Sequence, residues 1–180
     1  MKTSLKTLIV FALVVHFHSC AQTSKTNDNS TISTSFNLEN SLVANGYIKI
    51  PMTKEISGHL LLMGSINGVD GTFVLDTGAG ATVIEQTQKG KFKMKSTKSE
   101  NSATGAGGAG ITLEDSENNE LILSSLKLEN KSLTLMDLSH VNDAYEALGI
   151  EKIDGVIGAD ILTDSNAIID YKNLVLYLKK

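Results

Sequence analysis

The residues best suited to chemistry form a short run, Asp-Thr-Gly-Ala-Gly, at positions 76–80. The run follows the apolar residues 73–75, and a carboxylate at the end of a buried strand is costly to desolvate unless hydrogen bonds or a function compensate. Gly78 and Gly80 let the backbone turn sharply, so that amide groups can point at the carboxylate of Asp76. Two interpretations follow: a carboxylate placed for acid–base chemistry, or a turn in which the aspartate caps its own backbone.

Composition argues against several other classes of chemistry. The 180 residues carry 20 acidic and 16 basic side chains, a formal net charge of −4, and every basic residue is lysine. Without arginine the chain lacks the planar group preferred for phosphate and base-edge contacts, so we expect no nucleic-acid partner. One cysteine allows no disulfide framework or thiolate cage, and His59 and His140 show no H-E-x-x-H pattern. No metal and no cofactor is expected.

The N-terminus predicts export. Residues 1–20 have the layout of a secretory signal peptide, with two lysines before an apolar run at residues 8–15 that is too short to span a bilayer. The stretch that ends at Cys20 resembles a bacterial lipobox, in which the cysteine is lipidated, and ordinary cleavage after Ala21 is the alternative. We expect a lipoprotein of the bacterial cell envelope, anchored in the membrane through Cys20.

Residues 21–35 are rich in Ser, Thr and Asn and are expected to form a flexible tether, which leaves residues 36–180 as one folded domain. Inside this domain, Asn67-Gly68 is typical of a tight hairpin turn. Many short strands with turns between them predict an all-β domain, a closed barrel or a sandwich, with one or two short helices. Strands are expected at residues 60–66, 72–75, 82–85, 92–94, 111–113, 120–123, 126–128, 132–136, 153–157, 167–170 and 174–178, a helix at 141–148 and a helical turn at 159–162.

Two charged stretches receive structural interpretations. The lysines at positions 89, 91, 93 and 95 alternate with other residues, which favours a charged edge strand that resists aggregation. The acidic stretch 114–120 lacks the central glycine and terminal ligand of an EF-hand loop, so a solvated hairpin tip is expected there.

Residues 71–84, GTFVLDTGAGATVI, resemble the active-site loop of retropepsin-like aspartic proteases, in which an apolar strand delivers Asp-Thr-Gly-Ala and a second apolar strand follows. The family's other marker is two apolar residues and a glycine near the C-terminus, and Val156-Ile157-Gly158 matches it. The resemblance spans residues 60–178 and looks most like the single-lobe bacterial aspartyl protease domains. Viral members commonly carry an acidic residue where this chain has Gly80, so their subsite preferences are not carried over.

The resemblance implies a retropepsin-like fold and an aspartic endopeptidase that hydrolyses peptide bonds as a homodimer. Asp76, Thr77 and Gly78 would be its catalytic residues: two Asp76 carboxylates share one proton and activate a water, and Thr77 binds across the dimer axis. The chain has no second Asp-Thr-Gly, so a twin subunit must supply the other carboxylate. Ala79 offers no hydroxyl to stabilise the ionised pair, which favours a weakly acidic to neutral working pH.

The implied substrate-binding residues are Ala79 and Gly80 on the loop, and a second glycine-rich stretch of Gly105, Ala106, Gly107 and Gly108. That stretch contains G-x-G-x-x-G, but a dinucleotide loop needs a strand before it and a helix after it, and the flanking residues fit neither. A flap whose main-chain amides close on an extended peptide is favoured over a plain flexible loop.

The alternative function is a non-catalytic peptide-binding or scaffold lipoprotein with a retropepsin-like fold. Under both interpretations the expected partners are a peptide or protein, the membrane and a second copy of the chain.

Overall fold

Ten strands and three short helices make up the part of the chain that the computed structural model describes, residues 37–105 and 108–180. No helix in these two ranges is long and apolar enough to cross a membrane. The expected signal peptide, Cys20, the tether, Ala106 and Gly107 lie outside the described residues, so those predictions stand as they are. The elements are α1 (Leu38–Ala44), β1 (Ile48–Lys54), β2 (Leu60–Ile66), β3 (Val69–Leu75), β4 (Val83–Glu85), η1 (Gln86–Gln88), β5 (Thr97–Gly105), β6 (Gly108–Leu123), β7 (Leu126–Met136), α2 (Ser139–Ala147), β8 (Gly155–Ile157), α3 (Ala159–Asp164), β9 (Ile168–Asp170) and β10 (Val175–Leu178).

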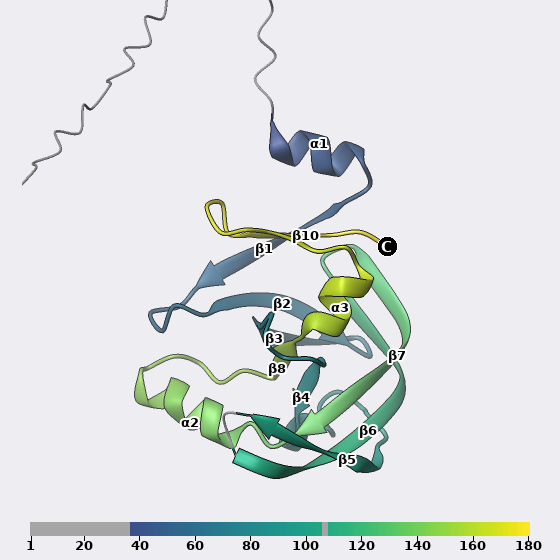
Figure 1. Ribbon diagram of the computed structural model, residues 1–180, viewed down its shortest axis with the longest axis vertical. Helices are drawn as coiled ribbons and strands as arrows, with labels where there is room; N and C mark the ends of the chain where they lie inside the picture. The colour runs from purple at the N-terminus through teal and green to yellow at the C-terminus, as the bar shows by residue number, and fades with distance from the viewer. Residues whose placement is uncertain (1–36, 106–107) are drawn as a thin grey trace, which may run out of the picture. The chain divides into compact units, whose positions relative to one another are not determined.

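Six of the strands close into a barrel, in the order β6, β7, β4, β8, β3 and β2 (Figure 1). The ring is completed where β2 pairs with β6, through Ser65 opposite Ile122 and Ile66 opposite Leu121. Closure pairs the edges that an open sheet would expose. The predicted all-β fold with a closed barrel and few short helices is therefore confirmed.

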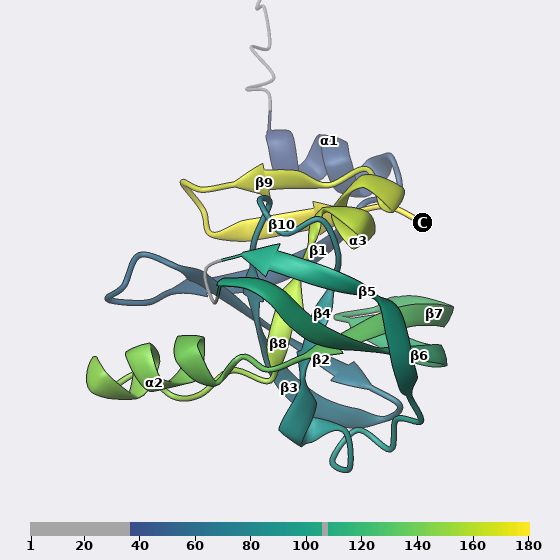
Figure 2. The same ribbon diagram turned by 60° about the horizontal axis from the view of Figure 1, so that its bottom comes forward.

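Strand β1 joins the barrel to a second, smaller sheet. Its first residues, Ile48–Pro51, pair with β10, and its last ones, Met52–Lys54, pair with β2. Strand β10 in turn pairs with β9, which is the last strand in the order and lies at the outer edge (Figure 2). One side of β9 is therefore free of a strand partner within the described residues.

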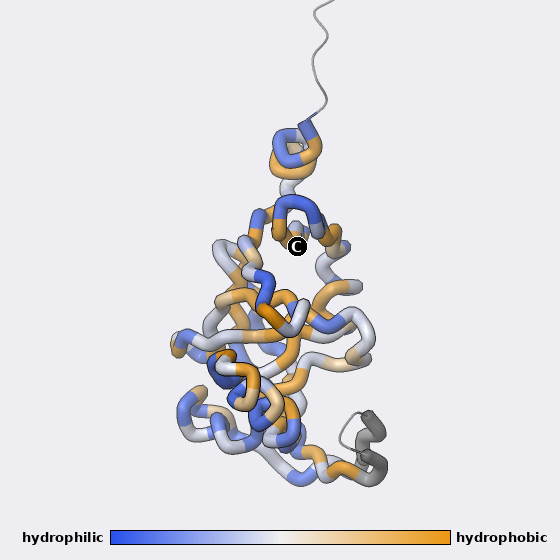
Figure 3. Tube along the Cα trace, turned by 90° about the vertical axis from the view of Figure 1, so that its left-hand side faces the viewer, coloured by the Kyte–Doolittle hydropathy of each residue, from blue (hydrophilic) through white to orange (hydrophobic). Residues whose placement is uncertain are grey.

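The core has two layers because β2 and β3 are buried on both faces. Leu60, Leu62 and Phe73 point into the barrel, whereas Leu61 and Val74 point outward. The outward side chains are covered by a second apolar cluster from α2 and the segment after it: Tyr145, Ile150 and Ile153. In Figure 3 the hydrophobic colour follows the strands, and hydrophilic colour gathers at the connecting turns. Burial on both faces explains why residues 60–62 form a continuous apolar run instead of an alternating one.

The expected strand at 92–94 and the charged edge strand are wrong. Residues 89–93 form turns, with Lys93 at a φ of 54°. These turns, and not a pleated strand, bury Phe92, whose ring stacks on that of Phe73 with centroids 6.3 Å apart. The side chains of these two lysines form separate ion pairs, Lys89 with Glu114 and Lys91 with Asp154. An alternating pattern arises here from tight turns that insert every second side chain into the core.

The acidic stretch 114–120 is not a hairpin tip but the middle of β6, which runs on for 16 residues. Register shifts between Ser116 and Asn119 let the polar residues bulge there. Asn119 is buried, and its side-chain amide donates to the carbonyl oxygen of Ser116 at 2.9 Å. Four elements were not among the expected helices and strands, namely α1, β1, η1 and β5. Helix α2 begins two residues before the expected helix.

Gly155 offers a test of the strand packing that supports the loop after β3. A Cβ atom at Gly155 would lie 2.4 Å from the carbonyl oxygen of Val83 on the neighbouring strand, so the two strands could not stay in register. We expect Gly155→Ala to lower the free energy of unfolding by about 1–3 kcal/mol, as overpacking does elsewhere. Gly90→Ala is the matched control, since a Cβ there has nothing within 4 Å. Urea denaturation of both variants measures the difference, and equal midpoints would contradict the packing described here.

Candidate active site

The candidate loop crosses the end of β8. Strand β8 pairs in parallel with β3 on one side, Leu75 opposite Ile157, and in antiparallel with β4 on the other, Val83 opposite Val156. The chain between β3 and β4, residues 76–82, must therefore arch over the end of β8. Because β3 and β8 run in parallel, Asp76 and Gly158 follow their strands at the same end of the sheet.

Two backbone hydrogen bonds fasten the loop to the end of β8 and to the start of the helix that follows it. The amide of Asp76 donates to the carbonyl oxygen of Ile157 at 3.1 Å, and the amide of Ala159 donates to the carbonyl oxygen of Ala79 at 2.7 Å. The loop also closes on itself, since the amide of Ala79 donates to the carbonyl oxygen of Asp76 at 3.3 Å. These bonds fix the main chain on both sides of the aspartate.

Gly158 is required by the close approach of the two segments. A Cβ atom at Gly158 would lie 2.5 Å from the carbonyl carbon and oxygen of Ala81 and 2.9 Å from the carbonyl oxygen of Ala79. These are backbone atoms that cannot move without opening the loop. The match between Val156-Ile157-Gly158 and the family's second marker therefore has a steric reason.

The carboxylate of Asp76 is exposed, although the strand that carries it is buried. One oxygen, Oδ1, accepts a hydrogen bond from the amide of Gly78 at 2.8 Å. The hydrogen bond expected of an aspartate that caps its own turn is therefore present, but it occupies only one of the two carboxylate oxygens. The second oxygen has no hydrogen-bond partner among the described residues, so a negatively charged oxygen on a rigid loop faces solvent.

Thr82 and Asp160 support the loop from beneath. The Thr82 side chain is 1% exposed; its hydroxyl donates to Oδ1 of Asp160 at 2.7 Å and accepts from the amide of Gly158 at 3.1 Å. Sequence reasoning did not single out Thr82. A threonine before two apolar residues is an ordinary strand pattern, so nothing in the sequence marked its hydroxyl as a bridge.

Thr77 is exposed and borders a shallow groove of about 370 Å³. The groove continues along α3 and β9, where Leu162, Ala167 and Ile169 line it. Ala79 is half-buried, and Gly80 is exposed with open space around it. All five residues expected on the loop therefore lie together at one end of the barrel, with their accessible atoms on the surface.

Tyr145 on α2 is a second residue that sequence reasoning missed. It is 3% exposed, and its ring lies 5.6 Å from that of His59, whose Nδ1 is 2.9 Å from the hydroxyl of Ser57. Burial raises the pKa of Tyr145, a hydrogen bond with Ser57 opposes this, and the carboxylates of Glu55 and Asp76 add to the rise. The phenol thus lies within electrostatic reach of Asp76.

The expected flap is a hairpin of β5 and β6. Gly105 at the end of β5 pairs with Gly108 at the start of β6. The closure of this hairpin over the Asp76 loop stays a prediction. Its base is held by Glu114, which accepts from Lys89 and Gln86 at 2.8 Å each and from Ser96. The bonds with Lys89, Ser96 and Gln86 lower the pKa of Glu114 to about 2.

Across the two described ranges, no three His, Cys, Asp or Glu side chains lie close enough together to hold a metal ion. The site consists of a carboxylate, a hydroxyl and main-chain amides. Groups of these kinds can polarise water and hold an extended peptide.

A family model described as aspartyl protease matches residues 62–161, which is more than half of the chain and includes both the loop and Gly158. The chain belongs to the aspartyl protease family. No curated protein is significantly similar to it in sequence.

Solved structures extend this assignment to the fold. A retropepsin-like aspartic protease from Rickettsia conorii is 19% identical over 74% of this chain and 90% of its own, with a TM-score of 0.50. A protease of EIAV, solved with an inhibitor, is 17% identical over 62% of this chain and 92% of its own, with a TM-score of 0.47. The likeness to the Rickettsia conorii structure shows that this member of the aspartyl protease family has a retropepsin-like fold, as the loop motif implied.

The hydroxyl of Thr82 is the first target for a test of the loop's support. Thr82→Val keeps the shape but leaves the amide of Gly158 and the carboxylate of Asp160 without their partner, which we expect to cost about 1–3 kcal/mol. Thr82→Ser keeps the hydroxyl and is the matched control. Urea denaturation measures stability, and hydrogen exchange of the Gly158 amide reports the local bond. Equal exchange rates in the two variants would refute the bridging role.

The Glu114 cluster predicts a pH-dependent contribution to stability. Because the folded state holds the Glu114 pKa at about 2 against an ordinary value of 4.5, the ionised carboxylate stabilises the fold above pH 4.5, and this contribution is lost as the pH falls toward 2. Glu114→Gln should therefore lower the melting temperature at neutral pH, with a difference from wild type that shrinks toward pH 2. Glu100→Gln, at an exposed position on β5, is the control. A difference that persists unchanged at pH 2 would contradict the assignment.

Proposed function

We propose that the chain is an aspartic endopeptidase that hydrolyses peptide bonds as a homodimer, with Asp76 of each subunit as the catalytic carboxylate. The observation that carries the proposal is the state of Asp76 in one subunit: its loop is rigid, its carboxylate is exposed and one carboxylate oxygen is free. A single carboxylate of this kind cannot serve as both acid and base. The site is complete only when a two-fold axis brings a second Asp76 beside the first.

The surface near the loop supports such an assembly. The groove beside Thr77 runs along α3 to β9, whose outer edge has no strand partner among the described residues. Tyr171, in the turn between β9 and β10, is a large exposed side chain. A second subunit that packs along α3 and β9 would cover the apolar lining of this groove and pair a free strand edge.

The reaction follows from two carboxylates that share one proton. The ionised Asp76 removes a proton from a water held between the pair, and the water oxygen bonds to the peptide carbonyl carbon. The protonated Asp76 gives its proton to the carbonyl oxygen, which avoids a bare oxyanion. As the intermediate collapses, the C–N bond breaks and the leaving nitrogen takes the proton that came from water. One hydroxyl group of the intermediate returns its proton to the ionised carboxylate, which yields the carboxylic acid and restores the shared proton. Thr77 and the clamp at Gly158 hold both loops still during these transfers.

Asp76→Asn is the decisive variant. Without an ionisable group, neither the water nor the carbonyl oxygen can exchange a proton with residue 76, so hydrolysis should fall about a thousandfold or more. Asp70→Asn, an exposed aspartate on the same strand, is the matched control and should retain full activity. Cleavage of an unstructured protein such as casein, followed by mass spectrometry across pH, measures the effect. Because Ala79 supplies no hydroxyl, the rate should peak at weakly acidic to neutral pH.

The outcomes separate the proposal from its rival. Hydrolysis that survives Asp76→Asn would refute the mechanism. Absence of hydrolysis at every pH, in a protein that sedimentation shows to be dimeric, would favour a peptide-binding or scaffold protein. A monomer at all concentrations would refute the shared site.

A further inference from the structure

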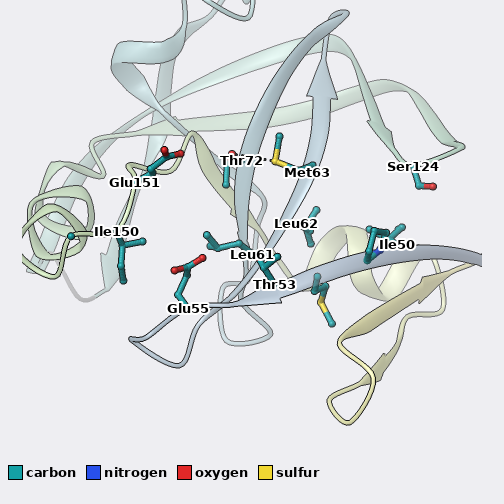
Figure 4. A pocket seen from close by; sticks show the side chains of 13 residues that line it. Ile50, Thr53, Glu55, Leu61, Leu62, Met63, Thr72, Ser124, Ile150 and Glu151 are labelled. Atoms are coloured by element: carbon teal, nitrogen blue, oxygen red, sulfur yellow. Dashed lines mark hydrogen bonds between the residues drawn. The ribbon is translucent and has the colours of Figure 1, made fainter.

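A second concave site lies on the outer face of β2 and β3, separate from the Asp76 loop. Its volume is about 600 Å³, and its floor is apolar, with Leu61 and Met63 from β2 and Ile150 from the segment after α2 (Figure 4). Met63 is 61% exposed, a large fraction for a methionine on a central strand. Glu55 and Glu151 stand on the two sides of this floor in Figure 4. We call this site the β2 pocket.

The two glutamates of the β2 pocket have no cationic partner within the described residues. Neither forms an ion pair, and none of the 13 residues that line the pocket is a lysine or histidine. The neighbouring Lys152 forms an ion pair with Glu146 instead, with its Nζ 3.0 Å from the Oε2 of Glu146. Two unpaired carboxylates therefore flank an apolar floor.

The β2 pocket is connected to the strand that precedes the Asp76 loop through the core. Leu61 and Ile150, which line the pocket, belong to the same apolar cluster as Val74 and Tyr145. Val74 is two residues before Asp76 on the chain.

We propose that the β2 pocket binds a lysine or arginine side chain of the polypeptide substrate, at a distance from the bond that is cut. The apolar floor fits the methylene stem of such a side chain, and the two glutamates fit its charged end. The pocket would repel nucleic acid and anionic lipid, and a neutral apolar side chain would leave both carboxylates without a partner. This inference rests on the proposed function for its biological meaning, because a substrate must be a polypeptide.

Direct binding tests the β2 pocket without turnover. The probe is a fluorescein-labelled peptide of alternating lysine and leucine, compared with the same peptide in which glutamine replaces lysine, both titrated into the Asp76→Asn protein. The lysine peptide should bind about fivefold more tightly or better, and Glu55→Gln/Glu151→Gln should remove that preference. Glu100→Gln/Asp143→Asn removes the same two charges elsewhere and should keep it. Raised salt should weaken the lysine peptide selectively.

A charge swap keeps the test decisive if the neutral variant folds poorly. Glu55→Lys/Glu151→Lys should prefer a glutamate-leucine peptide over the lysine peptide. Equal affinity for the lysine and glutamine peptides, or a lysine preference that survives both double variants at the pocket, would overturn the inference.

The two proposals fail in different ways. Loss of the lysine preference, with hydrolysis intact in the wild-type protein, overturns the β2 pocket alone. Absence of hydrolysis, with a lysine preference that depends on Glu55 and Glu151, overturns the endopeptidase and leaves a binding site for basic peptides.

Discussion

The close crossing of two backbone segments at Gly158 is the constraint on which the candidate site depends. The loop that carries Asp76 can arch over the end of β8 only because residue 158 has no side chain to push Ala79 and Ala81 away. The contact is then locked by hydrogen bonds that use main-chain groups on both sides and the buried hydroxyl of Thr82. A loop held in this way keeps a carboxylate in one place at the surface, which ordinary loops do not do.

The exposure of Asp76 has a simple physical reason. A carboxylate that is desolvated within one subunit would need a cation or several donors, whereas this one has the amide of Gly78 and solvent. In the homodimer proposed above, burial would occur on assembly, when two copies meet and a shared proton removes one of the two charges. The cost of burying a charge would then arise only in the assembled pair, where the shared proton lowers it.

Strands β2 and β3 are buried on both faces, and the α2 segment that covers their outer face connects the strand before the Asp76 loop to the β2 pocket. The segment with α2 covers the outer face of these strands, which explains their continuous apolar run, and it leaves Glu55 and Glu151 around an open apolar floor. The same packing that stabilises the strand before the Asp76 loop thus shapes the surface of the β2 pocket. Sequence reasoning saw the helix and the apolar strands separately, because contacts between residues far apart in the chain leave no local pattern.

The sequence by itself determined an all-β domain, a barrel or a sandwich, because turn residues and short apolar runs are local features. The loop at 76–80 and the glycine at 158 were recognised by the resemblance of two short motifs to a known family. The predictions from the sequence were wrong at residues 92–94 and 114–120. At 92–94, tight turns produce the alternation that is typical of a strand. At 114–120, a bulged strand carries the polar residues that are typical of a hairpin tip. Only the tertiary structure decided that Thr82 bridges Gly158 and Asp160, that Tyr145 packs with Leu61 and Val74, and that Glu114 ties the β5–β6 hairpin to Lys89. These contacts join segments brought together by barrel closure, and closure is a property of the whole chain that no short stretch encodes.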